Sequence, residues 1–172
     1  MIDFVTIKTD QDKTAFVKLN IEYFEWVWDQ FIESFNTDVI PLIGTPEEYV
    51  ENNKEEFFSY FPPKGICYLI RDGDNYIGMG ALRKIKEGIC EIKRMYVKSS
   101  YRGKGLGKSL LDKLTDDAKN FGFSKIYLDV GPYNIAAQGL YKKFGFIQRE
   151  PYPETEAPKE FLEHWTFMEK EI

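Results

Sequence analysis

Between residues 97 and 108 the chain reads VKSSYRGKGLGK, and its glycines alternate at Gly103, Gly105 and Gly107. A strand-like apolar pattern precedes this segment and a helical pattern follows it. Glycine lets successive backbone N–H groups surround an anion because no Cβ stands in the way. The amino end of the following helix adds unpaired N–H donors and a partial positive charge. The segment therefore predicts a phosphate-binding turn between a strand and a helix.

The same segment carries three cations on an acidic protein. Arg102, Lys104 and Lys108 stand among the glycines, although 23 Lys and Arg face 28 Asp and Glu and the net charge is −5. An anion site must therefore be local, and we expect no nucleic-acid partner. A flexible turn that happens to be basic is the alternative. The alternation of glycines at a strand-to-helix junction favours the anion site.

Two nucleotide-binding motifs come close to this segment but do not match it. A P-loop would have its first glycine at position 102, which is Arg102, although Gly107, Lys108 and Ser109 fit its end. A dinucleotide fingerprint has the spacing G-x-G-x-x-G, whereas the spacing here is G-x-G-x-G. A small nucleotide-binding protein therefore stays only as a competing hypothesis.

Two blocks of the chain resemble the GNAT superfamily of N-acetyltransferases. The first is similar to the signature Q/R-x-x-G-x-G/A behind a strand that ends in valine, through Arg102, Gly105 and Gly107 after Val97. The second, NIAAQGLYKKFGF at residues 134–146, is similar to the family's C-terminal motif N-x-x-A-x-x-L-Y-x-x-x-G-F. By motif the resemblance covers about residues 65–150, and by the order of elements it covers the whole chain.

The resemblance implies a fold and an activity. The fold would be α/β (α+β), one domain over residues 1–172 with a single mixed, mostly antiparallel twisted sheet flanked by helices and split by a bulge. The activity would be transfer of the acetyl group of acetyl-CoA, a cosubstrate, to a primary amine of a small molecule by direct attack in a ternary complex. No metal is implied. A homodimer is a fair expectation for this family.

The resemblance also places the coenzyme. The main-chain amides from Gly103 to Lys108, helped by Arg102, would hold its pyrophosphate, and the pantetheine arm would pair with the preceding strand as an added strand does. Asn134 would hydrogen-bond the coenzyme, and it also suits a helix N-cap. The expected coenzyme-binding residues are Met95, Tyr96, Val97, Arg102, Gly103, Lys104, Gly105, Leu106, Gly107, Lys108 and Asn134.

Two residues are expected to carry the chemistry. Tyr141 falls on the family tyrosine that faces the departing sulfur, and a phenol is a suitable acid for a thiolate. Glu91, six residues before Val97, has the spacing of the catalytic glutamate in the histone-acetylating branch of the family and is our candidate base. Glu91 could instead pair with Lys93 or Lys84 across the sheet, and a chain of waters could replace a single base. No Cys or Ser stands beside the only histidine, so a covalent triad has little support.

The acceptor is left open by the sequence. In the family its pocket is lined by the first helical region, here residues 22–29, and by late loops, here residues 152–159. Aromatic and acidic residues there suggest a small cationic amine, unless the aromatics are core and the acids a solvated face. Arg94 and Arg83 could instead receive a carboxylate, which would indicate an amino-acid-like acceptor. Acetylation of a protein lysine or N-terminus, and a non-catalytic acetyl-CoA-binding protein, are the remaining alternatives.

Periodicity and capping signals predict the order of elements. Thr9 with Asp12, and Thr45 with Glu48, have the spacing of capping boxes. Glycines mark the turns and the helix ends. In chain order we expect a strand at 2–8, helices at about 9–35 and 45–58, strands at 66–71, 76–84 and 89–97, a helix at about 106–121, a strand at 124–130, a helix at 134–144, and strands at 146–150 and 161–171.

The remaining composition indicates a protein of the cytoplasm. The first residues carry an acid and no apolar run of signal-peptide type. The longest apolar run, residues 66–70, is far shorter than the ~20 residues that span a bilayer, so we expect no membrane partner. Cys67 and Cys90 stand apart, which favours reduced thiols over a disulfide or a zinc site.

Overall fold

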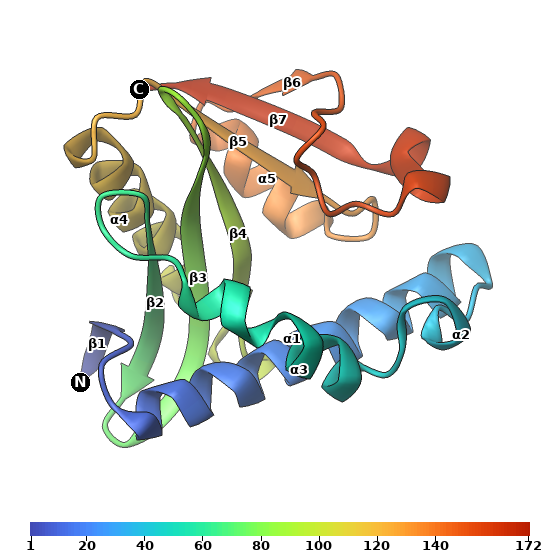
Figure 1. The fold of residues 1–172 in the computed structure, drawn as a ribbon, viewed down its shortest axis with the longest axis horizontal. Coiled ribbons are helices and arrows are strands. Elements are labelled where there is room, and N and C mark those ends of the chain that lie inside the picture. The colour runs from blue at the N-terminus through green and yellow to red at the C-terminus, as the bar shows by residue number, and fades with distance from the viewer.

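The computed structural model describes residues 1–172 and contains one seven-stranded sheet in the order β1-β2-β3-β4-β5-β7-β6 (Figure 1). Only β4 and β5 pair in parallel, so the sheet is mixed and mostly antiparallel, as predicted. The strands are β1 (Ile2–Thr6), β2 (Gly65–Asp72), β3 (Asn75–Lys86), β4 (Ile89–Val97), β5 (Lys125–Val130), β6 (Ile147–Arg149) and β7 (Thr166–Glu171). The helices are α1 (Asp10–Phe35), α2 (Ile40–Ile43), α3 (Pro46–Phe58), α4 (Leu106–Asn120) and α5 (Ile135–Lys143).

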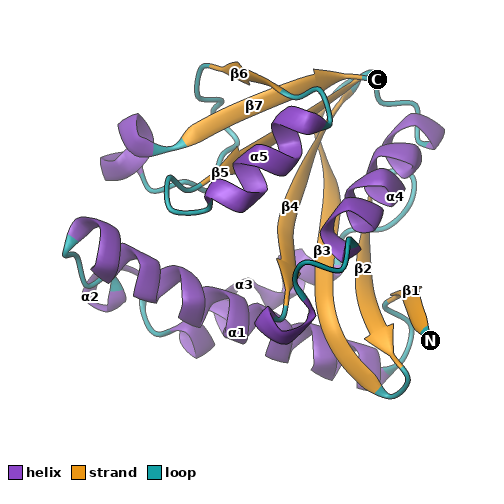
Figure 2. Ribbon diagram, turned by 180° about the vertical axis from the view of Figure 1, so that it is seen from behind, coloured by secondary structure: helices purple, strands orange, loops and turns teal.

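Helices cover the sheet on both faces, which explains the unbroken apolar run in β2. Ile66, Tyr68 and Ile70 point into a cluster formed with α4 and α5. Cys67 and Leu69, which alternate with them, point into a second cluster formed with α1 and α3. Figure 2 shows α4 and α5 on one side of the strands and α1 on the other.

The sheet divides between its two parallel strands. On β3, Ala81 pairs with Lys93 and Met79 pairs with Tyr96, so β4 carries one extra residue between these pairs. Arg94 lies in this bulge with a φ of 55°, a rare conformation for a side chain of its size. β4 pairs with β5 only over its first three residues, and the two strands then diverge (Figure 1). The bulge thus bends β4 away from β5.

Most expected elements are present, and one expected strand is partly wrong. Residues 161–165 do not extend the last strand, because Lys159–His164 forms a 3₁₀ helix and β7 begins at Thr166. Phe161 and Trp165 pack on Phe31 of α1, and their ring centroids lie 5.1 and 5.5 Å, respectively, from that of Phe31. This aromatic packing holds the segment out of the sheet. The short α2, which no pattern had predicted, begins with a proline in its first turn.

Both predicted capping boxes are present. The Asp12 N–H donates to Thr9 Oγ1 over 3.1 Å and the Thr9 N–H donates to Asp12 Oδ2 over 2.9 Å, and Thr45 with Glu48 repeats this exchange before α3. No helix is both long and apolar enough to cross a bilayer. The two cysteines are buried free thiols. Burial raises the pKa of each thiol to about 12.

Candidate active site

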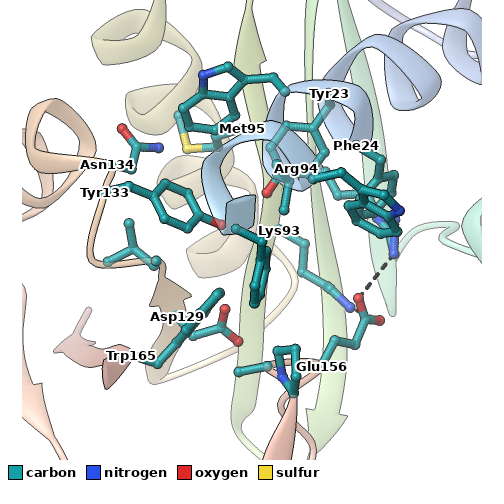
Figure 3. A pocket seen from close by; sticks show the side chains of 18 of the residues that line it. Tyr23, Phe24, Lys93, Arg94, Met95, Asp129, Tyr133, Asn134, Glu156 and Trp165 are labelled. Carbon is teal, nitrogen blue, oxygen red and sulfur yellow. Dashed lines mark hydrogen bonds and ion pairs between the residues drawn. The ribbon is translucent and has the colours of Figure 1, made fainter. Parts of the chain in front are cut away.

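A cavity of about 310 Å³ opens where β4 and β5 separate. Its wall comes from α1, the bulged part of β4, the end of β5, the start of α5 and the segment from residue 156 to residue 165 (Figure 3). Fifteen of its 24 lining residues are hydrophobic, so it combines a mainly apolar wall with a few polar groups. Such a composition and volume are typical of small-molecule sites.

The glycine segment forms an open turn at the amino end of α4. Gly103 and Gly105 have φ values of 77° and 79°, and a Cβ at either position would meet no atom within 4 Å. Gly105 is the N-cap, and the first intrahelical bond runs from the Ser109 N–H to the Gly105 oxygen over 3.0 Å. The amides of residues 106–108 therefore have no acceptor within the helix. They are free to bind an anion.

Basic side chains flank this turn. Arg102 is anchored by a 2.9 Å hydrogen bond from its Nε to the Val97 oxygen, and its guanidinium lies 5.6 Å from the ring centroid of Trp26 in the cavity wall. Lys104 lies over the Tyr101 ring, and Lys108 forms a 2.8 Å ion pair with Asp112. The turn and the cavity therefore adjoin, with Arg102 between them.

The end of β4 presents an unpaired edge towards the gap. Beyond Glu91 it has no partner on the β5 side. Val97 pairs with Gly78 on β3, and the Lys98 N–H donates to the Ile77 oxygen over 2.9 Å. This pattern makes Val97 and Gly78 a non-hydrogen-bonded pair, so the Val97 N–H points away from β3. Met95, Tyr96 and Val97 thus lie along an edge that an added strand could use.

Helix α5 brings two of the predicted residues to the cavity. Asn134 caps the helix by accepting the Ala137 N–H over 3.3 Å, and it also lines the cavity. Tyr141 is buried, lines the cavity and makes no hydrogen bond through its hydroxyl to the rest of the chain. Burial raises the pKa of Tyr141 above its ordinary value, with Tyr23 and Asp129 adding to the effect. The phenol is therefore neutral and keeps its proton.

Glu91 lies in the cavity wall, only 1% exposed, and both of its oxygens are engaged. Arg83 donates from Nε to Glu91 Oε2 over 2.7 Å, and the Tyr152 hydroxyl donates to Oε1 over 2.6 Å. Lys93 is more distant, at 4.0 Å, and Lys84 pairs with Glu87 instead. Burial raises the pKa of Glu91, although Lys93 and Arg83 act in the opposite direction.

A second carboxylate, which had not been predicted, belongs to the same network. Asp129, the last residue but one of β5, lines the cavity and accepts from Thr155 Oγ1 over 2.7 Å. The Tyr152 hydroxyl lies 3.3 Å from it, so this one phenol joins Asp129 to Glu91. Burial raises the pKa of Asp129, opposed by the Thr155 hydrogen bond and by Lys93. The only sequence signal was an acid near the end of an apolar strand.

Aromatic side chains of α1 form much of the cavity wall. Trp26 and Trp28 lie there with Trp165, so all three tryptophans of the chain line the cavity. The acids on the same helix do not line it, and Glu22 forms a 3.0 Å ion pair with Lys98. The aromatics of α1 thus belong to both the core and the cavity wall, while the acids of α1 lie outside the cavity, as in the alternative that the sequence left open. The acids that line the cavity are Glu91, Asp129, Glu156 and Glu160.

A charged cluster occupies one side of the cavity. Arg94 donates from Nη2 to Glu156 Oε2 over 3.1 Å, and Lys93 forms an ion pair with Oε1 of the same carboxylate (Figure 3). Arg83 Nη1 lies 3.6 Å from that oxygen. Burial acts to raise the pKa of Glu156, but Lys93 and Arg94 outweigh it and lower the pKa to about 2. Arg94 also stacks on Phe57, its guanidinium 3.5 Å from the ring centroid.

Residues 20–146 match the family model described as the acetyltransferase (GNAT) family, and the chain belongs to that family. An uncharacterised N-acetyltransferase of Schizosaccharomyces pombe is 29% identical over 135 residues, 77% of this chain and 80% of that protein. An IAA acetyltransferase of Azospirillum brasilense is 36% identical over 89 residues, 51% of this chain and 58% of the relative. A Dictyostelium discoideum relative, an uncharacterised N-acetyltransferase, is 44% identical over 64 residues, 37% of this chain but only 30% of the relative's length.

Solved structures show the same fold over the whole chain. A GNAT-family acetyltransferase of Staphylococcus aureus superposes with a TM-score of 0.71 at 21% identity and covers 99% of both chains. The PaiA N-acetyltransferase of Thermoplasma acidophilum, solved with coenzyme A, gives a TM-score of 0.69 at 20% identity over 100% of this chain and 99% of the other. The resemblance to the GNAT superfamily and the predicted mixed, mostly antiparallel sheet flanked by helices are confirmed.

Proposed function

We propose that the protein transfers the acetyl group of acetyl-CoA to the primary amine of a small molecule by direct attack in a ternary complex. One observation carries the proposal: the open turn at Gly103–Lys108, the unpaired edge of β4 and the cavity with Tyr141 meet where the sheet divides. The Thermoplasma neighbour, solved with coenzyme A, shows that a protein of this fold accepts the coenzyme.

The coenzyme would be held mainly by backbone groups. The free amides of residues 106–108 and the cations at Arg102, Lys104 and Lys108 suit a pyrophosphate. The edge of β4 at residues 95–97 suits the amide groups of a pantetheine arm. Asn134, on the opposite side of the gap, offers an amide group.

The thioester would react beside the end of β4. The Val97 N–H points to that side of the strand and could polarise the thioester oxygen as negative charge develops on it. Tyr141 is neutral, and its hydroxyl makes no other hydrogen bond within the chain. It can therefore donate a proton to the departing thiolate.

The incoming ammonium group must lose a proton before it attacks. Glu91 is the proposed base, acting directly or through water, and its raised pKa makes it a stronger proton acceptor than an exposed glutamate. Arg83 and Tyr152 hold its carboxylate in place. Tyr152 also lies 3.3 Å from Asp129, whose charge raises the pKa of Glu91, so uptake of a proton by Glu91 is coupled to the charge of Asp129.

The first test is thiol release from acetyl-CoA across panels of small amines, peptides and amino acids. Turnover of small amines supports the proposal, whereas faster turnover of peptides would indicate a protein acetyltransferase. Coenzyme binding without transfer to any acceptor would indicate a sensor, and tighter binding of ATP than of acetyl-CoA a nucleotide-binding protein.

The second test is the Tyr141→Phe variant. It should lower kcat by about 10²-fold or more while the affinity for CoA, measured by calorimetry, stays within about twofold. Tyr68→Phe is the matched control, because Tyr68 is also buried and its hydroxyl binds Asp117 over 2.8 Å outside the cavity. Wild-type turnover in Tyr141→Phe would remove this residue from the mechanism.

A further inference from the structure

Two buried cations in the cavity wall share a carboxylate from a surface loop. The side chains of Lys93 and Arg94 are 7% and 3% exposed, and both line the cavity. Glu156 belongs to the loop between β6 and the 3₁₀ helix, and a third of its side chain is exposed. The anion is therefore the accessible member of the cluster, and the cations are the fixed ones.

Arg94 is incompletely paired in this arrangement. Its Nη2 donates to Glu156, but its Nε and Nη1 are buried without a hydrogen-bond partner. Buried donors are almost always paired in folded proteins, so Arg94 depends on Glu156 for the only carboxylate that it binds. Without Glu156, Arg94 would have no carboxylate partner, and an unpaired buried cation is strongly unfavourable.

We infer that Glu156 is a specificity-determining residue that occupies the carboxylate position of the acceptor cavity, so that the acceptor is an aromatic or other apolar primary amine without an α-carboxylate. This inference rests on the proposed function. With Glu156 in place, one of the two positive charges of Lys93 and Arg94 is offset, and the Lys93 ammonium and the Arg94 Nη2 are already bound to a carboxylate. The second cation considered from the sequence, Arg83, is bound to Glu91, Glu56 and the Glu154 oxygen and does not line the cavity.

The rest of the cavity agrees with this class of acceptor. Its lining holds four carboxylates against two cations, and Arg83, which pairs with Glu91 from outside the lining, leaves one negative charge in excess, so the field favours an ammonium group over a carboxylate. Asp129 lies on the opposite side from the charged cluster in Figure 3 and is available to an ammonium group. Aromatic rings between them suit a flat apolar body. The aromatic lining residues are Tyr23, Phe24, Trp26, Trp28, Phe31, Tyr49, Tyr133, Tyr141 and Trp165.

Two pairs of acceptors that differ only in a carboxylate test the inference: phenethylamine with phenylalanine, and tryptamine with tryptophan. Thiol release from acetyl-CoA gives kcat/KM for each. The wild-type protein should prefer the amine in both pairs by about tenfold or more, and Glu156→Gln should shift the amine-to-amino-acid ratio at least tenfold towards the amino acid, since one charge pair of about 1.4 kcal/mol corresponds to that factor.

Two controls separate charge from structure. Glu156→Asp keeps the charge and should keep the wild-type ratio. Glu160→Gln removes another lining acid that forms no ion pair with Lys93 or Arg94, and it should leave the ratio unchanged. A ratio that Glu156→Gln does not move, or a wild-type preference for the amino acids, overturns the inference.

Failure of the proposed function gives a different result. In that case wild-type protein releases no thiol with any of the four acceptors. Fluorescence still decides the role of Glu156, because all three tryptophans line the cavity and report its occupation by phenethylamine or phenylalanine. Tighter binding of phenethylamine in wild-type protein, lost in Glu156→Gln, supports the inference, and equal binding of the two compounds in both proteins overturns it.

Discussion

Replacing Glu91 by glutamine tests whether this carboxylate is a base or only a partner of Arg83. Glutamine keeps the shape and one acceptor oxygen but cannot take a proton. If Glu91 is the base, kcat/KM should fall by about 10²-fold or more. The acid limb of the pH profile, expected above 4.5 because burial raises this pKa, should also disappear. Thiol release measured from pH 5 to pH 9 gives both results.

The effect of Glu91→Gln on stability follows from the electrostatics of the Arg83–Glu91 ion pair. Arg83 has a raised pKa because Glu91 and Glu156 stabilise its charge despite burial, whereas burial raises that of Glu91 and disfavours its charge. The desolvation of Glu91 is the larger effect, because the Glu91 side chain is 1% exposed whereas that of Arg83 is 17% exposed. The Coulomb gain therefore does not cover the desolvation of the carboxylate. Arg83 keeps Glu56 and the Glu154 oxygen as partners, so the free energy of unfolding of Glu91→Gln in urea should differ from wild type by less than about 2 kcal/mol.

Glu56→Gln provides the matched control. Glu56 also accepts from Arg83, over 2.8 Å, but it does not line the cavity. This variant should keep wild-type kcat/KM and the acid limb. If Glu91→Gln retains activity with an unchanged pH profile, or if both variants lose activity alike, Glu91 acts only by holding Arg83.

Three further changes test the coenzyme turn, a helix cap and the core. Gly105→Ala places a side chain at a φ of 79° and should weaken CoA binding several-fold by calorimetry, whereas Gly139→Ala, a helical site with nothing within 4 Å, should not. Hydrogen bonds from Tyr76 and Thr9 outweigh desolvation and lower the pKa of Asp12 to about 2. The Asp12 carboxylate therefore stabilises the fold above pH 3.8, and this stabilisation is lost as the pH falls through about 2. Thermal unfolding of Asp12→Asn should lack this acid-dependent loss of stability. Leu114→Ala, at a fully buried site, should cost about 2–5 kcal/mol in urea unfolding.

The sequence predicted a helix start or a turn correctly where interactions between residues close together in the chain determine it. The two capping boxes fix the starts of α1 and α3 through hydrogen bonds between residues three apart. The alternating glycines set positive φ values at Gly103 and Gly105. The strand expected at residues 161–171 was partly wrong because the contact that decides its first half, with Phe31, lies 130 residues away in the chain.

The candidate site was predictable only where a single segment forms it. Asn134 and Tyr141 belong to one short motif and line the cavity, and the glycine turn belongs to another and adjoins the cavity through Arg102 and Trp26. The groups that surround Glu91 come from distant elements, and no periodicity relates them. Tyr152, 61 residues away, and Asp129 join its network only because β4, β5 and the loop after β6 meet in the folded chain.

The bulge at Arg94 connects these observations. Neighbouring residues of a regular strand point to opposite faces, so Lys93 and Arg94 would be expected on different sides of the sheet. The positive φ at Arg94 breaks this alternation, and both side chains reach the same carboxylate of Glu156. The same irregularity bends β4 away from β5 and opens the cavity. One backbone conformation thus provides both the cavity in which we propose that the thioester and the amine meet and the pair of cations beside it. For this reason alternation along the sequence could not reveal the cluster.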